Sequence, residues 1–167
     1  MSTPEAASID DQPRSATIDL VAYGLIVAAI YGVLGPLWFE GARGKLFFPV
    51  PDGIIKMFDG TFVASFPGTD VAWFIVGLIE GIVVLTLAVS LVRGEFLPSR
   101  RKPWLLLSVA ASIFAYAVVA FGMTISGNGD GTASLYMYFA SSGVLLILLL
   151  LMPPYRSRNW LSGFSAR

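Results

Sequence analysis

Long apolar runs alternate with short polar segments along this chain. The runs occupy residues 20–39, 71–92, 104–125 and 133–152. A helix rises about 1.5 Å per residue and the hydrocarbon core of a bilayer is roughly 30 Å thick, so each run is long enough to cross it. The pattern predicts an all-α membrane protein in which residues 18–153 form a bundle of four transmembrane helices. We expect the first helix to end near Gly35–Pro36, because proline removes a backbone hydrogen bond.

The polar ends and loops set the expected orientation. Residues 1–17 are predicted to be a disordered tail, and residues 154–167 a short basic tail. Basic residues in short loops are retained in the cytoplasm. Eight of them lie in the two tails and the 93–102 loop, whereas Arg43, Lys45 and Lys56 lie on the other side. We therefore expect a multi-pass protein of a bacterial inner (plasma) membrane with both termini in the cytoplasm.

The composition favours the same class and narrows the chemistry. Apolar residues make up 56% of the 167 residues and charged residues 13%, which is not typical of a soluble domain. The chain has neither cysteine nor histidine. Disulfides, thiol redox chemistry and the usual zinc, copper, haem and iron–sulfur ligands are therefore excluded, and we expect no metal site. The net charge of zero indicates no nucleic-acid partner.

The segment between the first two helices, residues 40–70, is too long for a simple connection. Between Pro51 and Pro67 its apolar residues recur at helical spacing, which predicts a short amphipathic helix in the outer interface, broken early at Asp59–Gly60. Two interpretations are open: the aromatic residues anchor a loop to lipid, or the segment is a lid or docking face. The residues assigned to this outer interfacial site are Lys45, Phe47, Phe48, Ile54, Phe58, Phe62 and Phe66.

Small residues spaced four apart predict close helix packing, because lipid supplies no hydrophobic drive to bring helices together. Gly24, Ala28 and Gly32 have this spacing in the first run. Gly77 and Gly81 form a GxxxG motif in the second. We expect both sets to lie at helix–helix contacts.

Glu80 is the only charged residue within the 71–92 run. A carboxylate near the middle of a membrane should be protonated, hydrogen-bonded or turned toward other helices. The span limits place four other polar residues near its depth, and we expect Glu80 to meet some of them in the bundle centre: Tyr31, Tyr116, Ser141 and Ser142. Such a cluster is either a structural hydrogen bond that fixes helix register or a proton-linked or headgroup-binding site.

Several short motifs resemble the DoxX/DoxD-like family of four-helix membrane proteins. They are GARGKLF at residues 41–47, GLIEGIVV in the second run, and a basic turn before the third. The resemblance covers roughly residues 20–152, and by position Lys45 and Glu80 match the family pattern. It implies a four-helix fold and an association with membrane oxidoreductases, including quinone-linked ones. The chain departs from any thiol-redox version, because it has no cysteine.

No nucleophile–base pair, metal cluster or phosphate-binding loop is evident in the sequence, so we expect no catalytic residues and do not expect an enzyme. The favoured function is a non-catalytic accessory subunit of a larger membrane complex, with other membrane subunits and lipids as partners. We expect no cofactor for this function. Two alternatives stay open: that the protein binds a lipid or a quinone, and that it forms a homo-oligomer. The alternatives are a component of a quinone-linked oxidoreductase and a small proton- or lipid-linked transporter that uses Glu80.

Overall fold

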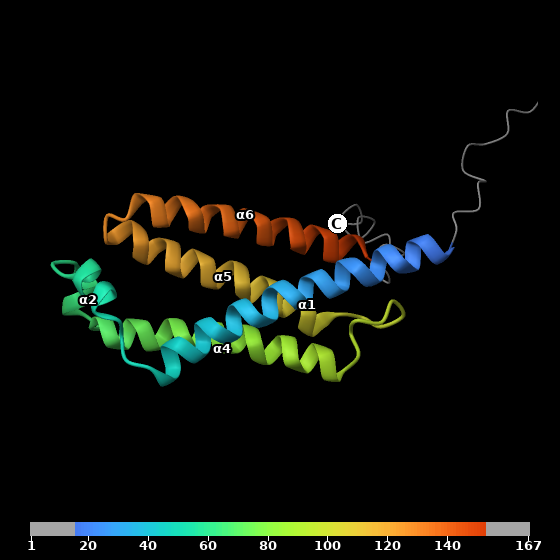
Figure 1. Ribbon diagram of the computed structural model, residues 1–167, viewed down its shortest axis with the longest axis horizontal. Coiled ribbons are helices and arrows are strands. Elements are labelled where there is room, and N and C mark those ends of the chain that lie inside the picture. Colours follow the sequence, from blue (N-terminus) through green and yellow to red (C-terminus); the bar gives the residue numbers. More distant parts are fainter. Residues whose placement is uncertain (1–15, 153–167) are drawn as a thin grey trace, which may run out of the picture.

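Four long helices and two short ones make up the part of the chain that the structure describes, residues 16–152 (Figure 1). The structure is a computed structural model. The long helices are α1 (Ala16–Phe47), α4 (Thr69–Val92), α5 (Pro103–Ile125) and α6 (Gly129–Leu151), and the short ones are α2 (Asp52–Phe58) and α3 (Phe62–Ser65). All four long helices contain stretches that are apolar and long enough to cross a membrane. The predicted all-α, four-helix membrane bundle is thereby confirmed.

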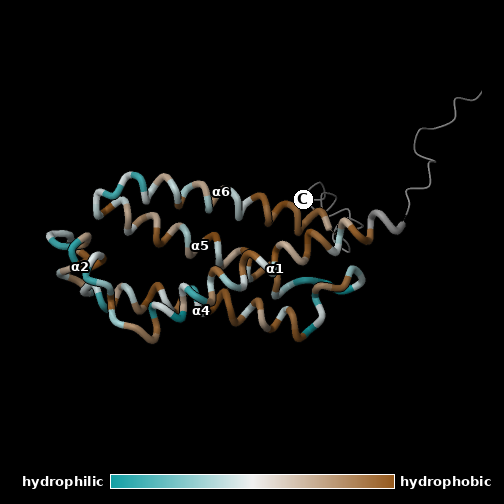
Figure 2. Tube along the Cα trace, in the orientation of Figure 1, coloured by the Kyte–Doolittle hydropathy of each residue, from teal (hydrophilic) through white to brown (hydrophobic). Residues whose placement is uncertain are grey.

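The long helices pack in the order α1, α4, α5, α6, and successive ones run in opposite directions (Figure 1). The start of α1 and the end of α6 therefore lie at one end of the bundle, together with the α4–α5 loop. We call this the loop end. The α2–α3 segment lies at the other end, which we call the covered end. Figure 2 shows hydrophobic residues along most of the long helices and hydrophilic ones mainly at the two ends and where α1 meets α4.

The core lies between the four long helices. It is built from residues at helical spacing on each of them, so that one stripe per helix is buried. From α1 it takes Val27, Ile30, Leu34 and Trp38, and from the others Val83, Leu87, Leu105, Val109, Ala115, Tyr116 and Leu149. Most remaining large apolar side chains are exposed on the outside of the bundle, as expected for surfaces in contact with lipid.

The first helix is longer than the sequence pattern predicted. It passes through Pro36 and continues to Phe47, instead of ending near Gly35–Pro36 or at Phe39. Neighbouring helices and local backbone adjustment allow proline inside transmembrane helices. Because of this extension, Lys45 lies in the bundle and not in the outer segment, where the sequence pattern predicted it. The helix also begins at Ala16, so it includes the last residues of the expected 1–17 tail; residues 1–15 and the predicted basic tail lie outside the described residues.

The outer segment has the structure that its pattern predicted, in two pieces. The first piece, α2, ends at Phe58, and Gly60 adopts a φ of 75°, a left-handed conformation that glycine tolerates best. The Asp59–Gly60 break is confirmed. A second short helix follows before the chain enters α4 through Gly68, whose φ is 101°.

The small-residue predictions have different outcomes in α1 and α4. An added Cβ on Gly24 or Gly32 would meet nothing within 4 Å, and Ala28 is exposed. This stripe therefore makes no close contact with the rest of residues 16–152, and α1 packs instead through larger side chains on another face. Gly77 does lie at a close approach, because a Cβ there would come 2.8 Å from the Cβ of Lys45. Gly81 is looser, with Leu46 Cδ1 at 3.7 Å.

Candidate functional site

An ion pair joins α1 to α4 inside the bundle. The Lys45 ammonium donates to both carboxylate oxygens of Glu80, at 2.8 Å and 2.9 Å. Glu80 is 4% exposed, and the side chain of Lys45 is 16% exposed. A buried carboxylate requires a partner, and here the partner is a cation from the neighbouring helix. The pair fixes how far α1 can slide along α4.

Two glycines make room for this pair. A Cβ on Gly41 would lie 2.6 Å from Oε2 of Glu80, and one on Gly77 would meet the stem of Lys45. Any side chain at either position would displace a charged group or separate the helices. The GxxxG glycine at position 77 therefore serves the ion pair directly, and Gly41 of α1 has the same role on the opposite side.

Trp73 completes the surroundings of the pair. The Lys45 nitrogen lies 4.9 Å from the centre of its ring, within the range of a cation–π contact. The indole N–H of Trp73 is buried and has no hydrogen-bond partner among residues 16–152. A buried donor without an acceptor is costly, so this N–H is available to an oxygen atom of a bound molecule.

Two residues of the predicted polar cluster bond away from Glu80. Tyr31 shares a 2.7 Å hydrogen bond with Ser90, ten residues farther along α4 than Glu80. Ser141 is exposed and donates to the carbonyl of Met137 in its own helix. The predicted depth of Tyr31 is wrong because α1 extends past the end of α4 at the loop end, so that Tyr31 lies level with Ser90.

The remaining two members of that cluster are buried. Tyr116 lies between two aromatic rings, with centroid distances of 4.7 Å to Trp38 and 5.7 Å to Tyr138, and it is close enough to Glu80 to interact with it electrostatically. Ser142 is 4% exposed on α6. Among residues 16–152, the hydrogen-bonding partner of Glu80 is Lys45.

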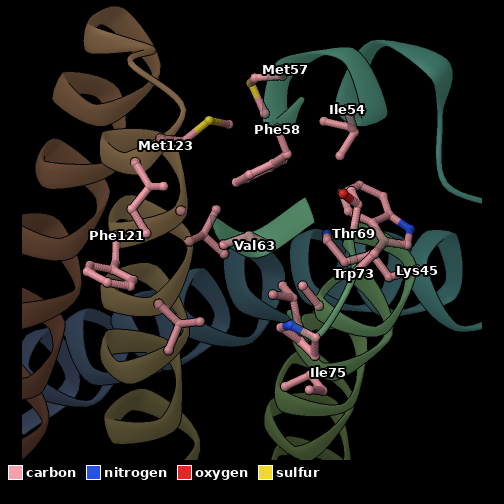
Figure 3. A pocket seen from close by; sticks show the side chains of 17 residues that line it. Lys45, Ile54, Met57, Phe58, Val63, Thr69, Trp73, Ile75, Phe121 and Met123 are labelled. Carbon is pink, nitrogen blue, oxygen red and sulfur yellow. The ribbon is translucent and has the colours of Figure 1, made fainter. Parts of the chain in front are cut away.

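An apolar pocket lies beside the ion pair at the covered end of the bundle (Figure 3). Its volume is about 230 Å³. The α4 and α5 helices form its sides, and α2 and α3 cover it with Ile54, Met57, Phe58 and Val63. Lys45 and Trp73 line the edge nearest the ion pair. The other lining residues are Pro67, Thr69, Ala72, Ile75, Val76, Val118, Val119, Phe121, Gly122, Met123 and Ile125.

The predicted outer interfacial residues separate into two groups. Ile54 and Phe58 face the pocket, and Phe58 comes so near α5 that a Cβ on Gly122 would lie 3.4 Å from its ring. The others are strongly exposed on the outside of the segment: Phe47, Phe48, Phe62 and Phe66. One side of the segment therefore covers the pocket, whose edge includes Lys45, and the other side faces outward. Lipid anchoring and docking both stay predictions.

A second polar network holds the loop end together. Glu95 is 2% exposed, and its carboxylate accepts hydrogen bonds from Ser90 Oγ and from the backbone N–H groups of Trp104 and Leu105, at 3.0, 3.3 and 2.9 Å. It thus caps the first turn of α5, whose N–H groups have no partner within the helix. Through Ser90 the network continues to Tyr31 on α1.

Lys102 lies fully buried next to this network. Its ammonium donates to the carbonyls of Leu97 and Arg100, at 3.2 Å and 3.0 Å, and lies 5.3 Å from the ring of Tyr23. Burial lowers the pKa of Lys102, and the nearby Glu95 carboxylate opposes that shift. The basic loop therefore contributes one of its cations to folding, whereas Arg93, Arg100 and Arg101 are exposed.

Sequence reasoning missed two features of these sites. It placed Lys45 outside the membrane, although Lys45 and Glu80 were the two residues that matched the family pattern by position. It gave Glu95 no role, because capping rules concern residues next to a helix and Glu95 lies eight positions before Pro103, the first residue of α5. Both errors concern which residues meet across helices, which a hydropathy pattern does not specify.

Comparison with known proteins finds no matching family model, no matching curated protein and no matching solved structure. The resemblance to the DoxX/DoxD-like family stays a prediction that rests on its short motifs.

Proposed function

We propose that this protein is a non-catalytic accessory component of a larger membrane complex, and that it holds a lipid-like apolar molecule in the pocket under α2 and α3. The observation that carries the proposal is the pocket itself. It is lined almost entirely by apolar side chains and has one polar edge, at Lys45 and Trp73. Ligand sites commonly combine an apolar wall with a few polar groups that set orientation.

The position of the pocket supports a ligand that comes from the bilayer. Ile75 on α4 and Phe121 on α5 line it and are themselves exposed, at 44% and 63%. The pocket is therefore reached from the side, between two membrane-spanning helices. The unpartnered N–H of Trp73 suits a molecule with an oxygen acceptor at one end. An acyl chain with an ester or acid group has this chemistry, and so does a quinone.

The place of α6 supports the accessory role. This helix lies at the end of the packing order, with its main contacts to α5. The first half of this helix exposes Tyr136, Met137 and Phe139, whereas Tyr138 stacks on Tyr116. Aromatic and methionine side chains are enriched where proteins bind one another. These exposed side chains are available to another membrane subunit.

The ion pair argues for a structural role of Glu80 and against the transporter alternative. Both carboxylate oxygens accept hydrogen bonds from Lys45. Proton-linked transport would require this carboxylate to gain and lose a proton during each cycle. The ion pair instead gives this carboxylate a fixed partner on the neighbouring helix, as a structural contact requires.

Fluorescence of Trp73 tests the binding proposal. Replacing Trp38, Trp104 and Trp160 by phenylalanine leaves Trp73 as the only tryptophan, since the chain has four. We expect a brominated fatty acid, added to the protein in detergent, to quench this fluorescence to saturation. Val118→Phe should abolish saturable quenching, because the larger ring fills the pocket.

Val144→Phe is the matched control, because Val144 is 56% exposed on α6 and away from the pocket. It should leave quenching unchanged. A short-chain quinone that displaces the fatty acid would identify a quinone site, and failure to displace it would identify an acyl-chain site. Equal, non-saturating quenching of both variants would contradict the proposal.

A further inference from the structure

Two charged side chains are exposed on α1 on either side of Gly41. Glu40 and Arg43 form an ion pair with an N–O distance of 3.1 Å, and their side chains are 63% and 50% exposed. The Arg43 guanidinium also lies 5.5 Å from the centre of the Phe48 ring. These contacts hold both charges beside α1 and keep them from extending toward either end of the bundle.

The depth of this pair is given by its neighbour Gly41, which abuts Glu80. Glu80 lies eleven residues after Thr69 and twelve before Val92, the ends of α4. At about 1.5 Å per residue, that is roughly 16–18 Å from each end. Glu40 and Arg43 are therefore exposed at the middle of a membrane-spanning helix. Charges facing hydrocarbon at this depth are strongly unfavourable, so this face requires a cover.

The backbone after α1 requires the same cover. The chain leaves the helix at Phe47, beside the middle of α4, and returns to α2 in an extended stretch at residues 48–51 (Figure 1). Phe48, Pro49 and Pro51 are exposed. Non-helical backbone at membrane depth occurs only where protein buries it or a water-filled cavity borders it.

A groove runs along this face between α1 and α4. Two adjoining hollows share Phe39, Val84 and Ala88. Small residues from both helices line them, namely Gly35, Ala42 and Gly81. The groove shares no residue with the ligand pocket.

We propose that a second copy of this chain covers this face, in a two-fold dimer formed through α1 and α4. The patch carries one positive and one negative charge, so it is complementary to itself. A two-fold axis along the membrane normal places the two α1 helices parallel. Glu40 of one copy then lies three residues, about 4.5 Å along the axis, from Arg43 of the other, within reach of these long side chains. The inference is independent of the proposed ligand.

Cysteine cross-linking in native membranes tests the dimer, because the chain has no cysteine of its own. Phe39→Cys and Leu85→Cys place a thiol in the groove. Ile147→Cys is the control, 58% exposed on α6. With a short bismaleimide, we expect a product of twice the chain mass from the groove variants and none from the control. Equal cross-linking at Ile147, or a groove product of any other mass, would overturn the proposal, the latter by indicating a different protein partner.

Charge reversal separates the dimer from random contact. Arg43→Glu, in the Phe39→Cys background, should reduce the cross-linked fraction at least fivefold, because like charges then meet across the axis. The double variant Glu40→Arg, Arg43→Glu should restore it, since both copies change together. The unfolding transition in mixed micelles of SDS and a mild detergent checks that each variant is folded. Undiminished cross-linking of a folded Arg43→Glu variant would refute the charge pairing. No product of twice the chain mass from either groove variant would overturn the dimer and leave lipid as the cover of the groove.

Discussion

Gly41 and Gly77 determine how closely α1 approaches α4, and this closeness allows a lysine and a glutamate to meet between them. Each glycine faces one member of the pair, and neither has space for a Cβ. A sequence shows such glycines but not which helix they face. The prediction that Gly77 lies at a close contact came from its spacing, whereas the role of Gly41 depends on the register between two helices.

Removing one charge of the pair should cost more than removing both. Glu80→Gln leaves a buried ammonium without its counter-charge, and we expect the free energy of unfolding to fall by about 3 kcal/mol. The double variant Lys45→Met, Glu80→Gln removes both charges and should recover more than half of that loss. Unfolding in mixed micelles of SDS and a mild detergent measures the free energy of unfolding of each variant.

Ligand binding by the same variants separates the two interpretations of Glu80. With a structural role, Glu80→Gln should lower the stability, and the folded variant should still give saturable quenching of Trp73. If Glu80→Gln kept full stability and lost only binding or transport, the carboxylate would have the functional role instead.

Among the elements, α1 shows what a hydropathy pattern can and cannot determine. The pattern located the apolar part of this helix correctly, because twenty apolar residues cross a bilayer whatever follows them. It misplaced the end, because Pro36 stops helices in water more effectively than it does inside a membrane bundle. The depth predicted for Tyr31 was wrong for a separate reason, because α1 begins beyond the end of α4 and Tyr31 therefore lies level with Ser90.

The start of α5 depends on Glu95. This carboxylate accepts hydrogen bonds from two N–H groups of the first turn and from a serine of α4. Glu95→Ala should lower the free energy of unfolding by about 2 kcal/mol, the combined effect of a lost cap and buried unpaired donors. Glu95→Gln, which keeps an acceptor, should cost less.

Asp59→Ala serves as the control for these variants, since Asp59 is exposed in the turn after α2. It should change stability by less than about 0.5 kcal/mol. A Glu95→Ala protein as stable as the control variant would show that the network does not hold the loop end together.

At the scale of the whole molecule, the number of long helices, their direction and the covering segment were predictable. Apolar runs of membrane length and a phenylalanine-rich loop report directly on these features. The pocket was not predictable, because it arises where Phe58 of α2 and Val118 of α5 face each other across a space. Such a space depends on packing between segments far apart in sequence.

The mass of the intact protein released from mild detergent tests the central claim most directly. We expect native mass spectrometry to show the polypeptide with one retained apolar molecule per chain. The Val118→Phe variant should lack that added mass, and Val144→Phe should keep it. A wild-type protein that carries no bound molecule, or a Val118→Phe variant that retains the same one, would contradict the account.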